Sequence, residues 1–219
     1  MESFPLSLRL YRWVVFLLAA GYAVYYLIWG SYAGTFAGPF RHLTIWALFL
    51  SFFCASRLMA LTEARSDRRW DALIAATAVI NMMVVFLYWK LYFADPTSVT
   101  SDGKLGVWYR EYYLHAVGPA HQIIDAIFFH RAFRRIRRAA EVLVGLVVVY
   151  LTWAEVVVRP LNDTPVGSVT SGLPYPFLNN MVFGDRLFFY AANVGTAIVF
   201  LLVFTVLSLI VARVRGVRY

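Results

Sequence analysis

Long apolar runs separated by short polar connections dominate this chain. Each run approaches or exceeds the roughly 18 residues that cross a bilayer as a helix. Because an isolated segment in hydrocarbon can satisfy its own backbone only as a helix, we expect an all-α, multi-pass membrane protein. The pattern predicts six transmembrane helices, at residues 11–30, 43–62, 71–93, 111–130, 140–158 and 187–212. The fourth run is the least apolar, since it contains His115, His121, Gln122 and Asp125.

Composition supports this class. The 219 residues are 61% hydrophobic and 18% aromatic, whereas soluble domains are about half apolar. We therefore treat residues 1–219 as one integral membrane domain with no room for a second, soluble one. The apolar run from Trp13 to Trp29 is longer than a usual signal-peptide core, so we expect a retained anchor helix. Cys54, the one cysteine, excludes an intrachain disulfide and is expected to be a small buried apolar group.

Basic residues divide unequally between the two ends of the predicted helices. Fourteen of the 20 lie on the side of the termini, which predicts that both termini are cytoplasmic. The net charge of +8 falls in short clusters between apolar runs, so we expect a membrane partner and no nucleic acid. The cluster at 131–138 can also be interpreted as a patch for nucleic acid or anionic lipid. If the chain is bacterial, its membrane would be the cytoplasmic one.

Function is expected on the side away from the termini, because the longer loops lie there. The loop 159–186 is rich in Pro and Gly, which is typical of a lid or binding loop. Three predicted helices begin on this side, and helix N-termini carry partial positive charge and unpaired N–H groups. Together with nearby arginines they favour a carboxylate, a phosphate or a developing oxyanion. Those arginines are Arg41, Arg110, Arg159 and Arg186.

Thr44 and His115 are the two candidate catalytic residues. Each lies about one turn inside the outer end of a helix that runs inward, so both share one depth. Polar groups within membrane helices are costly and mark candidate sites. The structural alternatives are ordinary ones: a helical Thr usually bonds its own i−4 carbonyl, and a His at an interface is often only an amphipathic side chain.

Other polar residues leave alternatives open. Glu155 lies near the depth of His115 and could orient it, whereas Asp125 is about 15 Å further along the helix. Asp125 and His121, four residues apart, can pair in a structural network. His42 with His115 would suit a metal or haem, although no third ligand has convincing spacing. Asn81 and Asn193 are expected to join helices to one another.

Three segments resemble one known family. The stretch 37–44, AGPFRHLT, is similar to the segment that carries the nucleophilic Thr of the androgen-induced and androgen-dependent multi-pass membrane proteins. His115, with Asp125 ten residues later and His130 fifteen later, resembles the region of that family's catalytic His. The sequence 175–178, YPFL, is similar to its Tyr-Pro loop. Pro119 lies one residue earlier than the family's proline, and the third outer loop is longer.

The resemblance implies a membrane-embedded hydrolase of fatty-acid esters of hydroxy fatty acids, with Thr44 as nucleophile, His115 as base and no metal or cofactor. The lipid substrate would enter from the bilayer. N–H groups at the start of the second helix, or Asn179 and Asn180, would stabilise the oxyanion. We assign substrate binding to Arg41, Arg110, Tyr175 and Arg186. The alternative is a non-enzymatic lipid-binding protein or transporter that uses the same outer cleft.

Overall fold

The structure is a computed structural model that describes residues 4–30, 34–100, 103–162 and 172–216. Within these residues the chain is helical, with short connections. The long helices are α1 (Leu6–Trp29), α2 (Leu43–Thr62), α3 (Asp71–Ala94), α6 (Ile136–Thr152) and α9 (Phe183–Val214). The shorter ones are η1 (Gly38–Arg41), η2 (Pro96–Ser98), α4 (Trp108–Tyr112), η3 (Tyr113–Val117), α5 (Gly118–Ile124), η4 (Asp125–Phe129), η5 (Trp153–Val158), α7 (Arg159–Asn162) and α8 (Pro176–Asn179).

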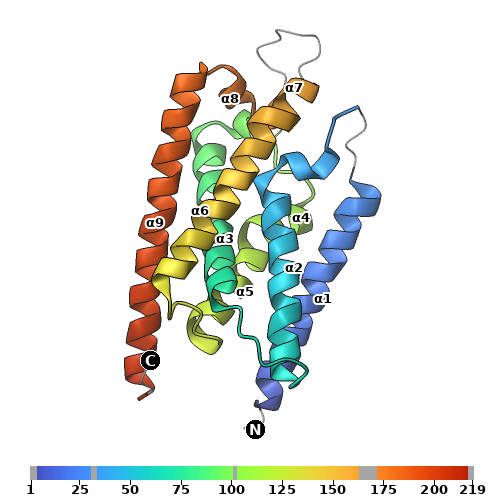
Figure 1. Ribbon diagram of the computed structural model, residues 1–219. Coiled ribbons are helices and arrows are strands. Elements are labelled where there is room, and N and C mark those ends of the chain that lie inside the picture. Colours follow the sequence, from blue (N-terminus) through green and yellow to red (C-terminus); the bar gives the residue numbers. More distant parts are fainter. Residues whose placement is uncertain (1–3, 31–33, 101–102, 163–171, 217–219) are drawn as a thin grey trace.

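The all-α membrane architecture predicted from the apolar runs is confirmed. Among the described residues, 5 helices are long and apolar enough to cross a membrane: α1, α2, α3, α9 and the continuous helix from Ile136 to Asn162. Both termini lie at one end of the bundle, and α7 and α8 lie at the other (Figure 1). The outer end, as we call it below, is the end that carries α7 and α8.

The predicted fourth span, 111–130, is a chain of short helical pieces from Trp108 to Phe129. Two of these pieces, η3 and η4, are π-helical. Pro119 accounts for the first, because it has no N–H to donate to the carbonyl of His115, four residues earlier. The indole of Trp89 donates to that carbonyl instead, at 2.8 Å. Such π turns occur often at functional sites, and this one contains His115.

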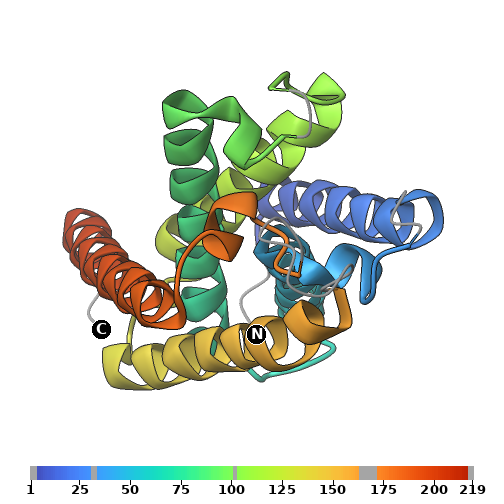
Figure 2. The same cartoon turned by 90° about the horizontal axis from the view of Figure 1, so that it is seen from above.

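α3 lies at the centre of the bundle and contacts α2, α5, α6 and α9. It is the most buried of the long helices, which its small residues allow, since Ala75, Ala76 and Ala78 are fully enclosed. α1 packs on α2 at one edge, and α9 packs on α3 and α6 at the other. Seen from the outer end, α8 and the segment before it lie over the middle of the bundle, between α3 and α6 (Figure 2).

A buried ion pair joins α1 to η4. Arg12 donates to both carboxylate oxygens of Asp125, at 2.9 and 2.8 Å, and to the hydroxyl of Thr62. The spacing of Asp125 and His121 allowed them to pair, but His121 contacts the hydroxyl of Tyr11 instead. The network interpretation of Asp125 holds, but its partner comes from α1, 113 residues away.

The outer loops are fixed to one another by hydrogen bonds. Asn162 at the end of α7 accepts from the backbone N–H of Phe36 at 2.7 Å and donates to its carbonyl at 3.3 Å. Arg41 reaches the carbonyl of Gly172, which has a φ of +97° that suits glycine. The predicted lid loop 159–186 falls partly outside the described residues, at 163–171. Its remaining part forms α7, α8 and the start of α9.

Candidate functional site

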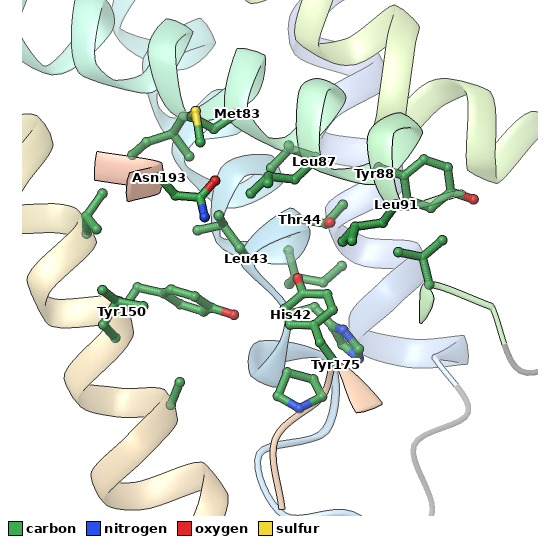
Figure 3. Close-up of a pocket in the computed structure, with 18 of the residues that line it drawn as sticks. His42, Leu43, Thr44, Met83, Leu87, Tyr88, Leu91, Tyr150, Tyr175 and Asn193 are labelled. Atoms are coloured by element: carbon green, nitrogen blue, oxygen red, sulfur yellow. The ribbon is translucent and has the colours of Figure 1, made fainter. Parts of the chain in front are cut away.

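A cavity of about 370 Å³ lies toward the outer end of the bundle. Its walls come from every long helix, and its lining is mostly apolar. Figure 3 shows Leu43, Met83, Leu87 and Leu91 around the space, with Thr44 facing into it. The lining residues with polar groups are Tyr26, His42, Thr44, Tyr88, Glu111, His115, Tyr150, Tyr175, Tyr190 and Asn193. Thr44 and His115, predicted from sequence to share one depth, therefore line one cavity.

The hydroxyl of Thr44 is available for chemistry. A Thr in a helix usually bonds the carbonyl four residues earlier, as Thr62 and Thr205 do here. For Thr44 that carbonyl belongs to Phe40, which already accepts from the indole groups of Trp46 and Trp153, at 2.9 and 3.0 Å. Among the described residues the Thr44 side chain has no hydrogen-bond partner. Its oxygen faces the cavity (Figure 3).

The imidazole of His115 is held at one nitrogen. Its Nδ1 lies 3.1 Å from the carbonyl of Glu111 and 3.3 Å from the carboxylate of the same residue. Both neighbours are acceptors, so Nδ1 carries the proton and Nε2 carries the lone pair. No described residue bonds Nε2. The ring of Tyr88 stacks on the imidazole, with centroids 3.5 Å apart and planes 6° apart. An imidazole fixed in this way is oriented to accept a proton at Nε2.

The acid at His115 is Glu111, which the sequence analysis did not single out. Glu111 also accepts a hydrogen bond from the hydroxyl of Tyr88, at 2.8 Å. It stands at the boundary of the predicted fourth span and looks like an ordinary rim residue. The signal that could have found it is the i, i+4 spacing to His115 on a helix. Glu155, predicted to orient His115, does not line the cavity.

Glu155 instead belongs to a cluster of ion pairs and hydrogen bonds beside the cavity, and its member Tyr190 also lines the cavity. Its carboxylate receives two bonds from Arg186, at 2.7 and 3.2 Å, and one from the hydroxyl of Tyr190, at 2.8 Å. Arg186 also donates to the carbonyl of Met181. Because Arg186 is paired in this way and lies outside the cavity lining, its predicted role in substrate binding gains no support from the geometry.

The other predicted binding residues differ in their placement. Tyr175 lines the cavity, whereas Arg41 and Arg110 do not. Arg110 donates to the hydroxyl of Tyr25, at 3.2 Å. Asn179, a predicted oxyanion donor, exchanges two bonds with the backbone of Leu173, both at 3.0 Å. Asn180 is exposed and also lies outside the lining. Asn179 therefore holds the loop before α9.

A polar corner of the cavity surrounds the first N–H groups of α2. Tyr150 donates to the carbonyl of Arg41 at 3.0 Å. Its oxygen and that of Tyr175 interact with each other and with the backbone N–H of Leu43. His42 stands edge-on to Tyr175, with ring centroids 5.9 Å apart. Burial lowers the pKa of His42 to about 4, with smaller contributions from Arg41 and His115, so its ring is neutral at pH 7.

Two further expectations concern Asn193 and metal binding. Asn193 was expected to join helices, but it donates to the carbonyl of Phe189 in its own helix, at 2.8 Å, and its side chain borders the cavity (Figure 3). Asn81 does join two helices, by donating to Ser51 at 2.9 Å. The residues that the structure describes contain no group of three or more His, Cys, Asp or Glu that could hold a metal ion.

This fold and its cavity define a multi-pass α-helical membrane protein with a mostly apolar internal pocket. A family model described as FAR-17a/AIG1-like protein matches residues 9–209, and the chain belongs to that family. The family suggested by the three sequence segments is thereby confirmed. Comparisons with curated proteins and with solved structures gave no match.

Proposed function

We propose that this protein hydrolyses lipid esters, such as fatty-acid esters of hydroxy fatty acids, with Thr44 as nucleophile and His115 as general base. The observation that carries the proposal is that two reactive groups without a hydrogen-bond partner among the described residues belong to residues that line one cavity. The Thr44 hydroxyl has no partner among the described residues, and the Nε2 lone pair of His115 is equally unused. Membership of the FAR-17a/AIG1-like family supports the proposal at the level of the family.

The reaction would proceed in two halves. The Thr44 oxygen attacks the ester carbonyl carbon while His115 Nε2 accepts the hydroxyl proton. The tetrahedral intermediate collapses, the C–O bond to the alcohol breaks, and His115 returns the proton to the leaving alkoxide. Water then attacks the acyl-threonine with His115 again as base. The C–O bond to Thr44 breaks, the proton returns to Thr44, and the carboxylic acid leaves.

The cavity suits a lipid on physical grounds. Its walls are formed by apolar side chains such as Met83, Leu87, Val147 and Val194, which favour an acyl chain over water. The polar groups gather near the start of α2, where the ester would lie. At the start of α2 the N–H groups of Leu43 and Ile45 already have acceptors, whereas no acceptor for the N–H of Thr44 is found among the described residues, so that group is the candidate donor to the oxyanion. We further propose that this end faces the non-cytoplasmic side, as the distribution of basic residues predicts.

The deciding experiment is turnover of a long-chain ester by the full-length protein in detergent micelles or nanodiscs. We expect release of fatty acid by the wild type and a loss of at least about 100-fold in Thr44→Val, which keeps the shape and removes the hydroxyl. Thr205→Val is the matched control, because Thr205 bonds its own helix and lies outside the cavity. Turnover by Thr44→Val close to the wild-type rate would contradict the proposal.

A non-enzymatic lipid-binding function is the second candidate, and the mostly apolar lining of the cavity favours it. A protein of this kind would bind a fluorescent fatty acid without hydrolysing any ester, and Thr44→Val would bind it as well as the wild type does. Parallel binding and turnover measurements on the same preparations separate the two functions. Binding without turnover in the wild type selects the second.

A further inference from the structure

Glu111 is an acid inside the cavity that the proposed two-residue chemistry does not use. It lies in α4, and its carboxylate is half-buried beside His115. An ionised carboxylate near the outer part of a membrane protein is costly unless it is paired or hydrogen-bonded. Its partners therefore indicate why it is there.

Those partners converge on one ring. The Oε2 atom of Glu111 lies 3.3 Å from Nδ1 of His115 and accepts the Tyr88 hydroxyl at 2.8 Å. Tyr88 in turn lies flat against the His115 imidazole. The ring is thus held in its plane by Tyr88 and at its edge by Glu111. In the part of the chain that the structure describes, no Lys or Arg lies within ion-pair distance of the Glu111 carboxylate. Arg110, its neighbour in sequence, is directed to Tyr25.

We infer that Glu111, held by Tyr88, is the positioning residue of His115, which it keeps as the Nδ1–H tautomer with Nε2 toward the cavity and whose protonated form it stabilises. This inference rests on the proposed function, since His115 must gain a proton during the reaction. A carboxylate at Nδ1 stabilises the imidazolium that forms when Nε2 takes the proton from Thr44. The residues would then act in the order Thr44, His115, Glu111.

Gly106 provides an independent way to disturb this arrangement. A Cβ at position 106 would lie 2.9 Å from Oε1 of Glu111, so Gly106→Ala must displace the carboxylate while leaving its charge in place. Glu111→Gln removes the charge and keeps the size. Tyr88→Phe removes one hydrogen bond to the carboxylate and keeps the stacked ring. The matched control is Glu141→Gln, because Glu141 is exposed on α6 and pairs only with Arg137 among the described residues.

The test is the titration of His115, followed by NMR on the full-length protein with isotope-labelled histidine. The chain has only 4 histidines, and a His115→Gln spectrum assigns the resonance. Besides Glu111 and Tyr88, the titratable groups that share the cavity with the ring are left unsubstituted in every variant: Tyr26, His42, Tyr150, Tyr175 and Tyr190. We expect Glu111→Gln to lower the titration midpoint of His115 by about one pH unit, because the imidazolium loses its carboxylate. We expect a smaller lowering in Gly106→Ala and no change in Glu141→Gln. An unchanged midpoint in Glu111→Gln would overturn the inference.

Turnover measured on the same variants separates this inference from the proposed function. If the protein is a hydrolase, Glu111→Gln lowers kcat by about 10–100-fold, and the acidic limb of its pH–rate profile moves to lower pH. Wild-type kcat and pH profile in Glu111→Gln would contradict the positioning role. A midpoint that moves in a protein without ester turnover would support the Glu111–His115 pair and count against the proposed function alone.

Discussion

Arg12 in α1 and Asp125 in η4 form a buried, bidentate ion pair, with only about 3% of each residue exposed. Removing one member of such a pair leaves an uncompensated charge in a low-dielectric interior, which costs about 3–5 kcal/mol. We therefore expect Arg12→Met to lower the midpoint of thermal unfolding in detergent sharply.

The double variant Arg12→Met/Asp125→Leu should recover most of this loss, since neither charge is then left unpaired. The midpoints of thermal unfolding of the single and double variants are measured on purified protein by circular dichroism, or by fluorescence without a thiol-reactive dye. A double variant that is as unstable as the sum of its singles would show that the pair does not act as a unit.

Glu155 and Arg186 lead to a second stability prediction. Glu155→Gln leaves the Arg186 guanidinium buried without a counter-ion, so we expect a loss of about 2–4 kcal/mol of folding free energy. Because the cavity lining excludes both residues, turnover per folded molecule should stay within about two-fold of the wild type. Chemical denaturation and active-site-normalised rates check the two halves. A large loss of rate at unchanged stability would return Glu155 to the catalytic site.

His42 makes stability depend on pH. Its pKa is about 4 in the folded protein and 6.5 in the unfolded chain, so the unfolded state binds more protons between these values. Stability is therefore full above pH 6.5 and falls as the pH drops toward 4, by up to about 3 kcal/mol. His42→Gln should lose less stability than the wild type over this window. Melting curves at pH 7.5 and pH 4.5 measure the difference, and identical slopes in the two proteins would exclude His42 as a contributor.

The size of the cavity leads to a prediction about chain length. Val194 is one of the apolar residues that line the cavity. Val194→Phe fills part of the 370 Å³ with an aromatic ring, so long acyl chains should be excluded before short ones. We expect kcat/KM for a long-chain ester to fall about 10-fold or more while that for a butyryl ester changes little. Equal losses for both esters would mean that the ring disturbs the fold and does not limit the length of the chain.

The helices were predictable from the sequence because membrane spans follow from local apolarity and length. The common depth of Thr44 and His115 was also predictable, because the directions of their two helices set the depth of each residue. Contacts between residues far apart in the chain could not be predicted from the sequence. Tyr88 meets Glu111 only because α3 packs against α5 and η3. Arg12 was counted among the charges that set the topology, and only the fold brings Asp125 beside it.

Side-chain directions around His115 could not be predicted from the sequence either. Pro119 replaces α-helical turns with a π turn, which changes the direction of the side chains around His115. Arginines at the outer rim were expected to bind substrate on charge alone, yet both Arg186 and Arg159 pair with the carboxylate of Glu155. Charge near a site predicts function only when no nearer counter-ion neutralises it.

Covalent trapping tests whether Thr44 is a nucleophile. Purified protein is treated with an alkyl fluorophosphonate, digested, and mapped by mass spectrometry. We predict one phosphonylated peptide, with the adduct on Thr44 Oγ1, no label in Thr44→Ala, and at least about 10-fold slower labelling in His115→Ala. Labelling of Thr44→Ala as fast as the wild type, or an adduct on another residue, would show that Thr44 is not the nucleophile.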